Sequence, residues 1–453
     1  MASFIIKRNK MFHCYLQRCL YTTRSKLAPA SVTLDESTDQ ALDAGKFKPR
    51  QHEGRLTTGC ISVPESIVSA ILRSCKDHPV KALQAEGIKL DNFLRSRKAP
   101  LEHNAIRQKI KDLRQSVGED FKSKLDVSTM SEERITYINT VIEAQAKKRA
   151  KQQIYAWKPI VYNQFKSLQY LLGRSAAEYA VLMRIFDEIR HRDAEFKPRS
   201  FIDFGSGVGT GTWAVSTLWK DHIFEYVSID ASAEMNELAE LLIRGGEINK
   251  AMSLRTVYYR QFLPASRNRY DIVLSAFSLF ELPSKKNRLE VIENLWNKCD
   301  GYLVLVEQGS YAGFSLIEEA REFLLEKFKT SEVAYHIFSP CPHQQQCPRM
   351  QLDDGTPCNF EASYNPLPLG KTGEVSKFLY SYVVFKKGEP CTHYPRLVRQ
   401  TLVRSKHSIC RMCTENGKLQ EIIFTASKHG KNLYRCARAS KWGDQLPVKI
   451  NEV

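Results

Sequence analysis

Three cysteines in the C-terminal half of the chain lie in a segment that suits metal binding better than packing. Cys341 and Cys347 each precede a proline, Cys358 follows one, and the spacing is C-x5-C-x10-C. Such a proline-rich polar loop lacks a hydrophobic core of its own, and thiolate ligation supplies folding free energy where packing cannot. A tetrahedral site needs a fourth ligand. Downstream, Cys410 and Cys413 are the two candidates.

Four thiolates suit either a zinc ion or an iron–sulfur cluster. Structural zinc sites usually draw their ligands from two close C-x2-4-C pairs, and the first three cysteines are not paired in that way. The irregular spacing therefore favours a 4Fe-4S cluster over zinc. The alternatives that stay open are zinc, a ligand set that includes His343 or His407, and cysteines that carry no metal.

A second group of residues with chemical potential is the glycine-rich stretch after Asp203. An apolar run precedes this aspartate, and Gly205, Gly207 and Gly209 follow at every second position. This pattern predicts a buried strand, a tight loop and then a helix whose free N–H groups face a ligand. It differs from the dinucleotide fingerprint, because Thr210 stands where the third glycine is required.

The order D-x-G-x-G-x-G is instead similar to the first motif of S-adenosylmethionine-dependent methyltransferases. A second carboxylate, Asp230, ends the next predicted strand, where it can accept hydrogen bonds from ribose hydroxyls. The sequence thus predicts an S-adenosylmethionine site formed by Asp203, Gly205, Gly207, Gly209 and Asp230.

The elements that must position these residues alternate regularly between residues 201 and 338. Strands are predicted at 201–204, 226–230, 254–259, 271–275, 302–307 and 333–338, with helices at 212–220, 233–243, 287–298 and 314–328. This alternation indicates an α/β fold with a doubly wound, Rossmann-like class I methyltransferase sheet. Its ligand crevice lies outside the carboxyl ends of the strands, where Asp203, Asp230, Ser275 and Glu307 are expected.

The last strand of such a sheet is predicted at 378–385, forty residues after the strand before it. The cysteine loop, residues 339–376, is therefore an insertion that something other than packing must order. We expect a methyltransferase-like domain at 166–388 that contains this insertion, preceded by a polar segment and a helical region at 31–165. Residues 31–58 are expected to be poorly ordered or to wrap a neighbour, and a long helix is predicted from Ser131 to Tyr155.

The first 34 residues contain no Asp or Glu, and basic residues are spread among apolar ones. This composition is typical of a mitochondrial transit peptide, predicted at 1–30, and it indicates the mitochondrial matrix. No apolar run reaches membrane-spanning length, so no membrane partner is expected. In a reducing compartment, twelve cysteines favour metal ligation over a disulfide framework.

The formal net charge of +17 points to a polyanionic partner. Basic residues dominate the C-terminal extension, 389–453, where Tyr394, Tyr434 and Trp442 are interleaved. Cations for phosphate and rings for unpaired bases suit RNA, while the alternative is a solvated surface. Two strands joined by a basic turn are predicted at 419–426 and 432–437. The separate basic group from Lys147 to Lys151 is interpreted as a solvated helix end.

With these motifs assembled, the chain resembles the methyltransferase-like protein 17 family, mitochondrial relatives of bacterial and yeast small-subunit methyltransferase-like proteins. The resemblance covers residues 165–447. It rests on the C-P-H-x3-C-P run at 341–348, the P-C-N-F element at 357–360, and L-Y-R-C-A-R at 433–438 followed by W-G-D at 442–444. It implies a matrix assembly factor that binds small-subunit rRNA, contacts ribosomal proteins, and holds a 4Fe-4S cluster through Cys341, Cys347, Cys358 and Cys413, with Cys410 in reserve.

Two features bear on catalysis, and the first is a departure from the family pattern. After the fifth strand the family pattern resembles E-P-G-T, whereas this chain has E-Q-G-S at 307–310, with Gln308 in place of the proline. Residues 275–281 also lack the N-P-P-Y-like motif that base N-methyltransferases carry at that place. Nor does a cysteine stand there to attack a pyrimidine. No catalytic residue is therefore named, and enzymatic activity is left open. The alternatives to an assembly factor are an active S-adenosylmethionine-dependent rRNA methyltransferase with a zinc or iron–sulfur site, and a purely structural ribosomal protein.

Overall fold

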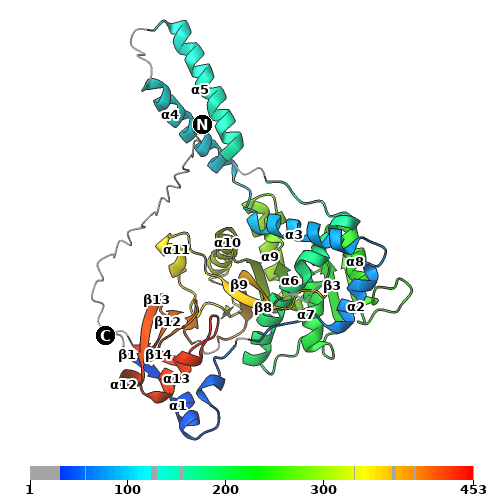
Figure 1. The fold of residues 1–453 in the computed structure, drawn as a ribbon, viewed down its shortest axis with the longest axis vertical. Helices are drawn as coiled ribbons and strands as arrows, with labels where there is room; N and C mark the ends of the chain where they lie inside the picture. Colours follow the sequence, from blue (N-terminus) through cyan, green and yellow to red (C-terminus); the bar gives the residue numbers. More distant parts are fainter. Residues whose placement is uncertain are drawn as a thin grey trace, which may run out of the picture.

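The computed structural model describes residues 31–56, 58–123, 130–153, 157–330, 332–369, 374–390 and 394–451. The predicted transit peptide at 1–30 lies outside them. Figure 1 shows a central α/β body, a smaller unit at the C-terminal end of the chain, and a helical arm that projects from the body. Within the described part of the chain, no helix is long and apolar enough to cross a membrane.

The central sheet has the α/β topology that the strand and helix pattern predicts, and it is mixed because its last strands pair antiparallel. In the part of the chain described, eight strands join it in the order β4-β3-β2-β5-β6-β9-β7, with β8 also paired to β9. Pairing is parallel from β4 to β6, whereas β9 runs antiparallel to its neighbours β6, β7 and β8. The strands are β2 (Ser200–Phe204), β3 (Glu225–Ile229), β4 (Val257–Arg260), β5 (Tyr270–Ala276), β6 (Cys299–Gln308), β7 (Tyr335–Ser339), β8 (Phe360–Tyr364) and β9 (Ser376–Lys387).

Helices cover both faces of the sheet and enclose two apolar cores. One core lies under α6, α7 and α8, and the other lies under α9 and α10. Parallel strands buried on both faces need apolar side chains throughout, which explains why these strands read as continuous hydrophobic runs. The helices are α6 (Gln164–Arg192), α7 (Thr210–Trp219), α8 (Ala233–Ile243), α9 (Lys285–Asn297) and α10 (Tyr311–Lys327).

The inserted cysteine loop contains more regular structure than its sequence indicated. A short helix, α11 (Pro348–Leu352), follows Cys347, and β8 adds an unpredicted strand beside β9. In β8, Phe360 and Ala362 are buried, whereas Glu361 between them and Ser363 after them are less so, which is the period-two pattern of a strand. The run is only five residues long, so the sequence analysis did not predict this strand.

The N-terminal region is helical, as predicted, and docks on α6. It contains α2 (Glu65–Ser74) and α3 (Val80–Ser96), and α3 lies close against α6. A Cβ atom on Gly87 would lie 2.7 Å from the carbonyl oxygen of Gln169, and one on Gly173 would lie 2.4 Å from the carbonyl oxygen of Gly87. The two helices can approach this closely only because both crossing positions lack a side chain.

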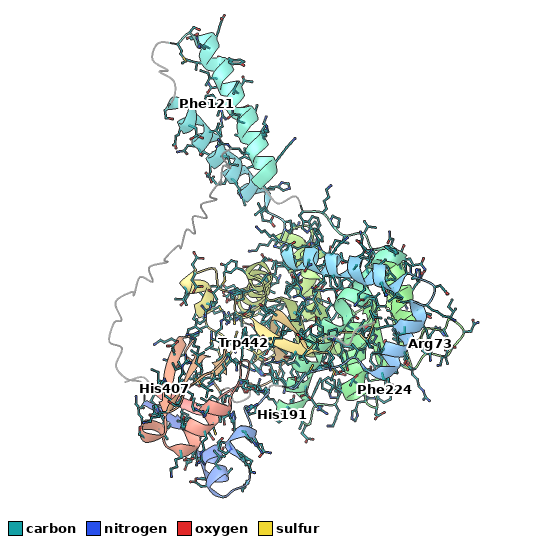
Figure 2. All side chains as sticks on the ribbon, in the orientation of Figure 1. Arg73, Phe121, His191, Phe224, His407 and Trp442 are labelled. Carbon is teal, nitrogen blue, oxygen red and sulfur yellow. The ribbon has the colours of Figure 1, made fainter. Side chains whose placement is uncertain are left out.

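The arm consists of α4 (His103–Lys122) and α5 (Glu132–Gln153), which pack against each other. The helix predicted from Ser131 to Tyr155 is therefore found as α5, and its last two predicted residues lie outside the described residues. Figure 2 shows Phe121 near the far end of α4, well away from the body.

Residues 31–56 wrap around the C-terminal unit of the same chain. Strand β1 (Ser31–Leu34) pairs antiparallel with β14 (Val448–Asn451), and α1 (Glu36–Asp43) and a short 3-10 turn (Pro49–Gln51) follow. Of the two expectations for this segment, an ordered wrap around a neighbour is the one found. The neighbour is the chain's own C-terminal end.

In the C-terminal unit, one of the two predicted strands is confirmed and the other prediction is wrong. Strand β13 (Leu419–Thr425) is found where it was predicted, and it pairs with β12 (His407–Cys413). The second predicted strand, 432–437, is instead part of helix α13 (Lys431–Ala439). Its buried residues Leu433, Cys436 and Ala437 follow the i, i+3, i+4 spacing of a helix, which a short apolar run does not reveal reliably. The unit also contains β10 (Arg396–Leu397), β11 (Leu402–Val403) and α12 (Ala426–His429).

Candidate cofactor pocket and cysteine cavity

A pocket of about 410 Å³ opens at the carboxyl ends of the central strands. Its volume falls in the range of small-molecule sites. Residues after β2, β3, β4 and β5 line one side, and residues from α3, from the 157–162 segment and from α6 line the other. The pocket therefore lies where a doubly wound sheet places its ligand crevice.

The glycine turn and the loop after β3 are joined by one carboxylate. Gly205, Gly207 and Gly209 all have positive φ, which a side chain would oppose. The Oδ2 atom of Asp230 accepts a hydrogen bond from the Gly207 N–H at 2.9 Å, and its Oδ1 atom accepts one from the Ser232 N–H at 2.9 Å. Burial raises the pKa of Asp230, and these two backbone donors act in the opposite direction.

The five residues predicted to hold the cofactor do not all reach the pocket wall. Gly205, Gly207 and Asp230 line it, whereas Asp203 lies beneath the loop. A Cβ atom on Gly211 would lie 2.3 Å from Oδ2 of Asp203, so this carboxyl packs under the first turn of α7. Burial raises the pKa of Asp203 well above its usual value, and the negative charge of Asp230 is the second cause. Gly209 caps α7 and faces Trp213 rather than the pocket.

The two other predicted edge residues, Ser275 and Glu307, are fully buried. The Ser275 hydroxyl hydrogen-bonds the Ser278 hydroxyl at 2.7 Å, and Oε1 of Glu307 accepts from the Leu279 N–H at 2.8 Å. Burial raises the pKa of Glu307 to about 8. Both residues therefore brace the loop after β5 instead of facing a ligand.

The loop after β5 is tightly constrained against the glycine turn. Phe277 has a φ of +57°, an uncommon backbone conformation for a bulky residue. A Cβ atom on Gly205 would lie 2.4 Å from Cβ of Ser278, so the two loops meet where only glycine fits. Residues in such conformations persist where the surrounding structure holds them, often beside ligand sites.

Sequence reasoning missed the residues that cover the far side of this pocket. Arg97, at the end of α3, and Glu281, after β5, form a salt bridge at its wall. They are 184 positions apart, and neither belongs to a motif that marks it out. No local signal could have paired them.

The second candidate site is a small cavity lined by the thiols of Cys341, Cys347, Cys358 and Cys413. Cys341 follows β7, Cys347 precedes α11 and Cys358 precedes β8, while Cys413 ends β12 in the C-terminal unit. The fifth candidate, Cys410, points elsewhere. It belongs to the core of the C-terminal unit, where its thiol lies 3.6 Å from the carbonyl oxygen of Ala437.

Basic and polar side chains surround the four thiols. Arg349, Arg396 and Arg399 line the same cavity, and Arg321 donates to the backbone carbonyls of His343 and Gln345. Nε2 of His343 lies 3.3 Å from Sγ of Cys413. Burial lowers the pKa of His343 to about 4, and the positive charge of Arg321 is the second cause. This imidazole is therefore neutral near pH 7. His407, the other alternative ligand, does not line the cavity.

Four thiols lining one cavity are the donor type that a thiolate-bound metal centre uses. Burial raises the pKa of all four thiols, and at Cys413 the other three cysteines raise it further, so metal binding would release protons. The nine cysteines in the described ranges are free thiols. In the conformation described, no three of the described His, Cys, Asp or Glu side chains lie close enough together to hold a metal ion.

The strand order, the antiparallel β9 between β6 and β7, and the pocket at the strand ends define a methyltransferase-like α/β protein. The chain belongs to the Rsm22 family, because the model for the mitochondrial small ribosomal subunit Rsm22 family matches residues 164–447. It is 35% identical over 405 residues to the human ribosome assembly protein METTL17, mitochondrial, an alignment that covers 88% of this chain and 86% of that protein.

A more distant relative is the Saccharomyces cerevisiae ribosome assembly protein RSM22, mitochondrial. It is 21% identical, and the alignment covers 59% of this chain and 64% of that protein. Among solved structures, magnesium protoporphyrin IX methyltransferase from Synechocystis with bound SAM aligns over 51% of this chain and 87% of its own, at 13% identity and a TM-score of 0.30. The mitochondrial location predicted from the N-terminal composition is confirmed by the relatives, which are named mitochondrial.

Proposed function

We propose that this protein is an assembly factor of the mitochondrial small ribosomal subunit that binds rRNA through its C-terminal unit. The observation that carries the proposal is membership of the Rsm22 family, with a human relative named a ribosome assembly protein. The methyltransferase-like body then acts as the scaffold that presents the C-terminal unit. Ribosomal proteins of the assembling subunit are its further partners.

The rRNA surface we propose is the exposed side of α12 and α13. Lys428, Lys431, Arg435 and Arg438 are exposed, and the last three follow the i, i+4, i+7 spacing of one helix face. We call these four residues the basic face. On the opposite side, α13 packs into the core of the C-terminal unit through Leu433, Cys436 and Ala437. Cations arranged on one rigid face suit the RNA phosphate backbone.

We further propose that Cys341, Cys347, Cys358 and Cys413 bind a 4Fe-4S cluster. Three of these ligands come from the inserted loop and one from the C-terminal unit, so the cluster joins two parts of the chain. When bound, the cluster supplies a covalent cross-link between them. The arginines around the cavity offset the negative charge that four thiolates bring, and the Cys413 thiolate accepts a hydrogen bond from His343 if Nε2 carries the proton.

Anaerobic purification of the mature chain, followed by iron, acid-labile sulfide and zinc analysis with visible absorption, tests the metal proposal. Four irons and four sulfides per chain are expected. Stoichiometric zinc without sulfide would replace the cluster with the zinc alternative. For the assembly proposal, cells depleted of the protein are expected to accumulate small-subunit precursors, and the protein is expected to sediment with precursors rather than mature ribosomes.

We propose that the 410 Å³ pocket binds S-adenosylmethionine, with the ribose on Asp230 and the rest of the ligand along Gly205 and Gly207. Support comes from the glycine turn, whose positive φ angles let the backbone approach a ligand, and from the position of Asp230 at the end of β3. Calorimetry with the cofactor, using wild type and Asp230→Asn, tests this. If Asp230→Asn abolished cofactor binding and a specific rRNA methyl group also disappeared, the result would favour the alternative function, an active methyltransferase.

A further inference from the structure

The two halves of the cofactor pocket differ in their contacts with the rest of the chain. The nucleoside half is formed by the glycine turn and Asp230, and its rim carries Phe262, which is 80% exposed. The acceptor half is formed by residues 276–281 after β5, the place where base N-methyltransferases hold the target amine. Among the described residues, two other segments of the chain hydrogen-bond directly to the second half.

Two segments clasp the acceptor half at Phe280 and Glu281. From one side, Arg97 pairs with the Glu281 carboxylate and donates to the Phe280 carbonyl at 3.3 Å. From the other side, Nε1 of Trp157 donates to the same Phe280 carbonyl at 2.8 Å, and the Ile160 N–H donates to Oε2 of Glu281 at 3.3 Å. We call residues 94–97 and 157–162 the covering segments.

The covering segments are also bonded to each other and to the strand ends. Arg97 donates to the Lys158 carbonyl at 3.2 Å, and Nε2 of Gln308, at the end of β6, donates to the Leu94 carbonyl at 2.5 Å. The Arg97 side chain is 1% exposed, so its charge depends on Glu281 for compensation. Removing one partner of such a buried pair is costly, because the other is left uncompensated. The covering segments are thus fixed against the acceptor half.

The same segments reach the nucleoside half through one hydrogen bond. The Ser232 hydroxyl donates to the Tyr162 carbonyl at 3.0 Å, and the Ser232 N–H donates to Asp230. Tyr162 packs edge-on against Tyr170, with ring centroids 5.6 Å apart, and both tyrosines line the pocket. A ligand on Asp230 would therefore touch the loop that holds the 157–162 segment.

The arm grows out of the two covering segments. Helix α4 begins at His103, six residues after Arg97, and α5 ends at Gln153, four residues before Trp157. Figure 1 shows the two helices running away from the body, with their near ends beside it. The covering segments are thus each followed or preceded in the chain by a helix of the arm.

We propose that the pocket holds the adenosyl cofactor as a resident ligand with its acceptor half closed by the covering segments, and that cofactor occupancy sets how firmly the arm is held. This inference rests on the proposed cofactor pocket and is independent of the cysteine site. In this proposal, the covering segments keep an RNA base out of the acceptor half. The ligand then acts as a structural effector and not as a methyl donor.

Hydrogen exchange of the full mature chain, with and without S-adenosylhomocysteine, tests the coupling. That probe lacks the transferable methyl group, so binding is read without turnover. We expect exchange in residues 157–162 and at the near ends of α4 and α5 to slow by about fivefold or more, while the far part of α5 around residues 132–140 stays unchanged. Arg97→Gln is expected to abolish the response at the arm. The adjacent exposed cation provides a matched control, and Lys98→Gln is expected to keep it.

Three results would overturn the inference. Calorimetric binding without slower exchange at residues 157–162 would remove the coupling, and absence of binding to both wild type and Arg97→Gln would remove the ligand. Methyl transfer by the wild-type chain to a small-subunit RNA fragment would show that the acceptor half is open. Small-subunit assembly is scored separately in cells, so a failed coupling with intact assembly would contradict this inference and leave the assembly function standing.

Discussion

Arg396 of the C-terminal unit and Glu188 of α6 form a buried two-point salt bridge. Nη2 of Arg396 lies 2.6 Å from Oε1 of Glu188, and Nη1 lies 3.1 Å from Oε2. Nε of the same guanidinium donates to the Pro340 carbonyl at 3.1 Å, immediately before Cys341. One side chain therefore connects the C-terminal unit, the helical face of the sheet and the start of the cysteine loop.

Breaking this salt bridge should destabilise the whole chain. Arg396→Met leaves the buried Glu188 carboxylate with Arg192 as its remaining cationic partner, and we expect it to cost about 3 kcal/mol of unfolding free energy. Denaturant melts monitored by fluorescence measure it. The exposed pair on the same helix, Asp187 and Arg190, is the control, and Asp187→Asn should cost less than about 1 kcal/mol. Equal losses in the two variants would contradict the role assigned to Arg396.

The Glu188 pair also has a pH signature. Burial opposes ionisation of Glu188, but Arg396 and then Arg192 outweigh it and lower its pKa to about 2. The folded state thus binds this proton less readily than the unfolded chain. The stability it contributes is present above pH 4.5 and is lost as the pH falls toward 2. Acid melts of wild type and Glu188→Gln should converge over that window, and parallel curves would argue against it.

Cys347 and Cys410 should respond differently to replacement by serine. Cys347→Ser removes a proposed ligand, and we expect loss of iron and sulfide together with faster proteolysis of the C-terminal unit, because the cross-link to Cys413 is gone. Cys410→Ser places a hydroxyl in the core of that unit, so a stability cost of about 1–3 kcal/mol is expected with iron content retained. If Cys410→Ser lost its iron and Cys347→Ser kept it, Cys410 would replace Cys347 in the proposed ligand set.

Glu307 should make stability fall between weakly acidic and weakly basic pH. Its pKa is raised to about 8 by burial, so the folded state keeps a proton that the unfolded chain releases near pH 4.5. The stability associated with that proton is present below pH 4.5 and is lost as the pH rises to about 8. Glu307→Gln has a neutral polar side chain at every pH. Its free energy of unfolding should therefore rise relative to that of wild type by on the order of 1 kcal/mol per pH unit in this window. Urea melts at pH 6 and pH 8 measure the gain. Exposed Glu290→Gln, the control, should show none.

Reversing charge on the basic face should weaken RNA binding selectively. Lys431→Glu with Arg435→Glu removes two phosphate contacts, and the slope of log affinity against log salt should fall by about 1.4 in magnitude for single-stranded rRNA. Filter binding over a salt series gives the slope. Lys147→Glu with Lys148→Glu, on the arm, matches the charge change and is expected to leave the slope unaltered. A larger effect from the arm variant would move the RNA surface away from α13.

The strands and helices of the sheet were predictable because their signal is local. The apolar runs before Asp203 and Asp230 and the helical spacing in α6 lie within short windows of sequence. Strand β8 and helix α13 were missed or misread, because each is short and its apolar spacing becomes clear only against its partners. The glycine turn was found as a motif, but the position of Asp203 beneath it depends on α7.

By itself, the sequence determined the class of fold, the family, and the set of cysteines and glycines that can do chemistry, because residue type and spacing carry that information. Only the tertiary structure decided which of them meet. It brought Cys413 rather than Cys410 to the three loop cysteines, because alternate residues of β12 face opposite sides of the strand and the odd spacing separates the two thiols. It also set Arg97 on Glu281 and Arg396 on Glu188, contacts between distant segments that no local pattern encodes.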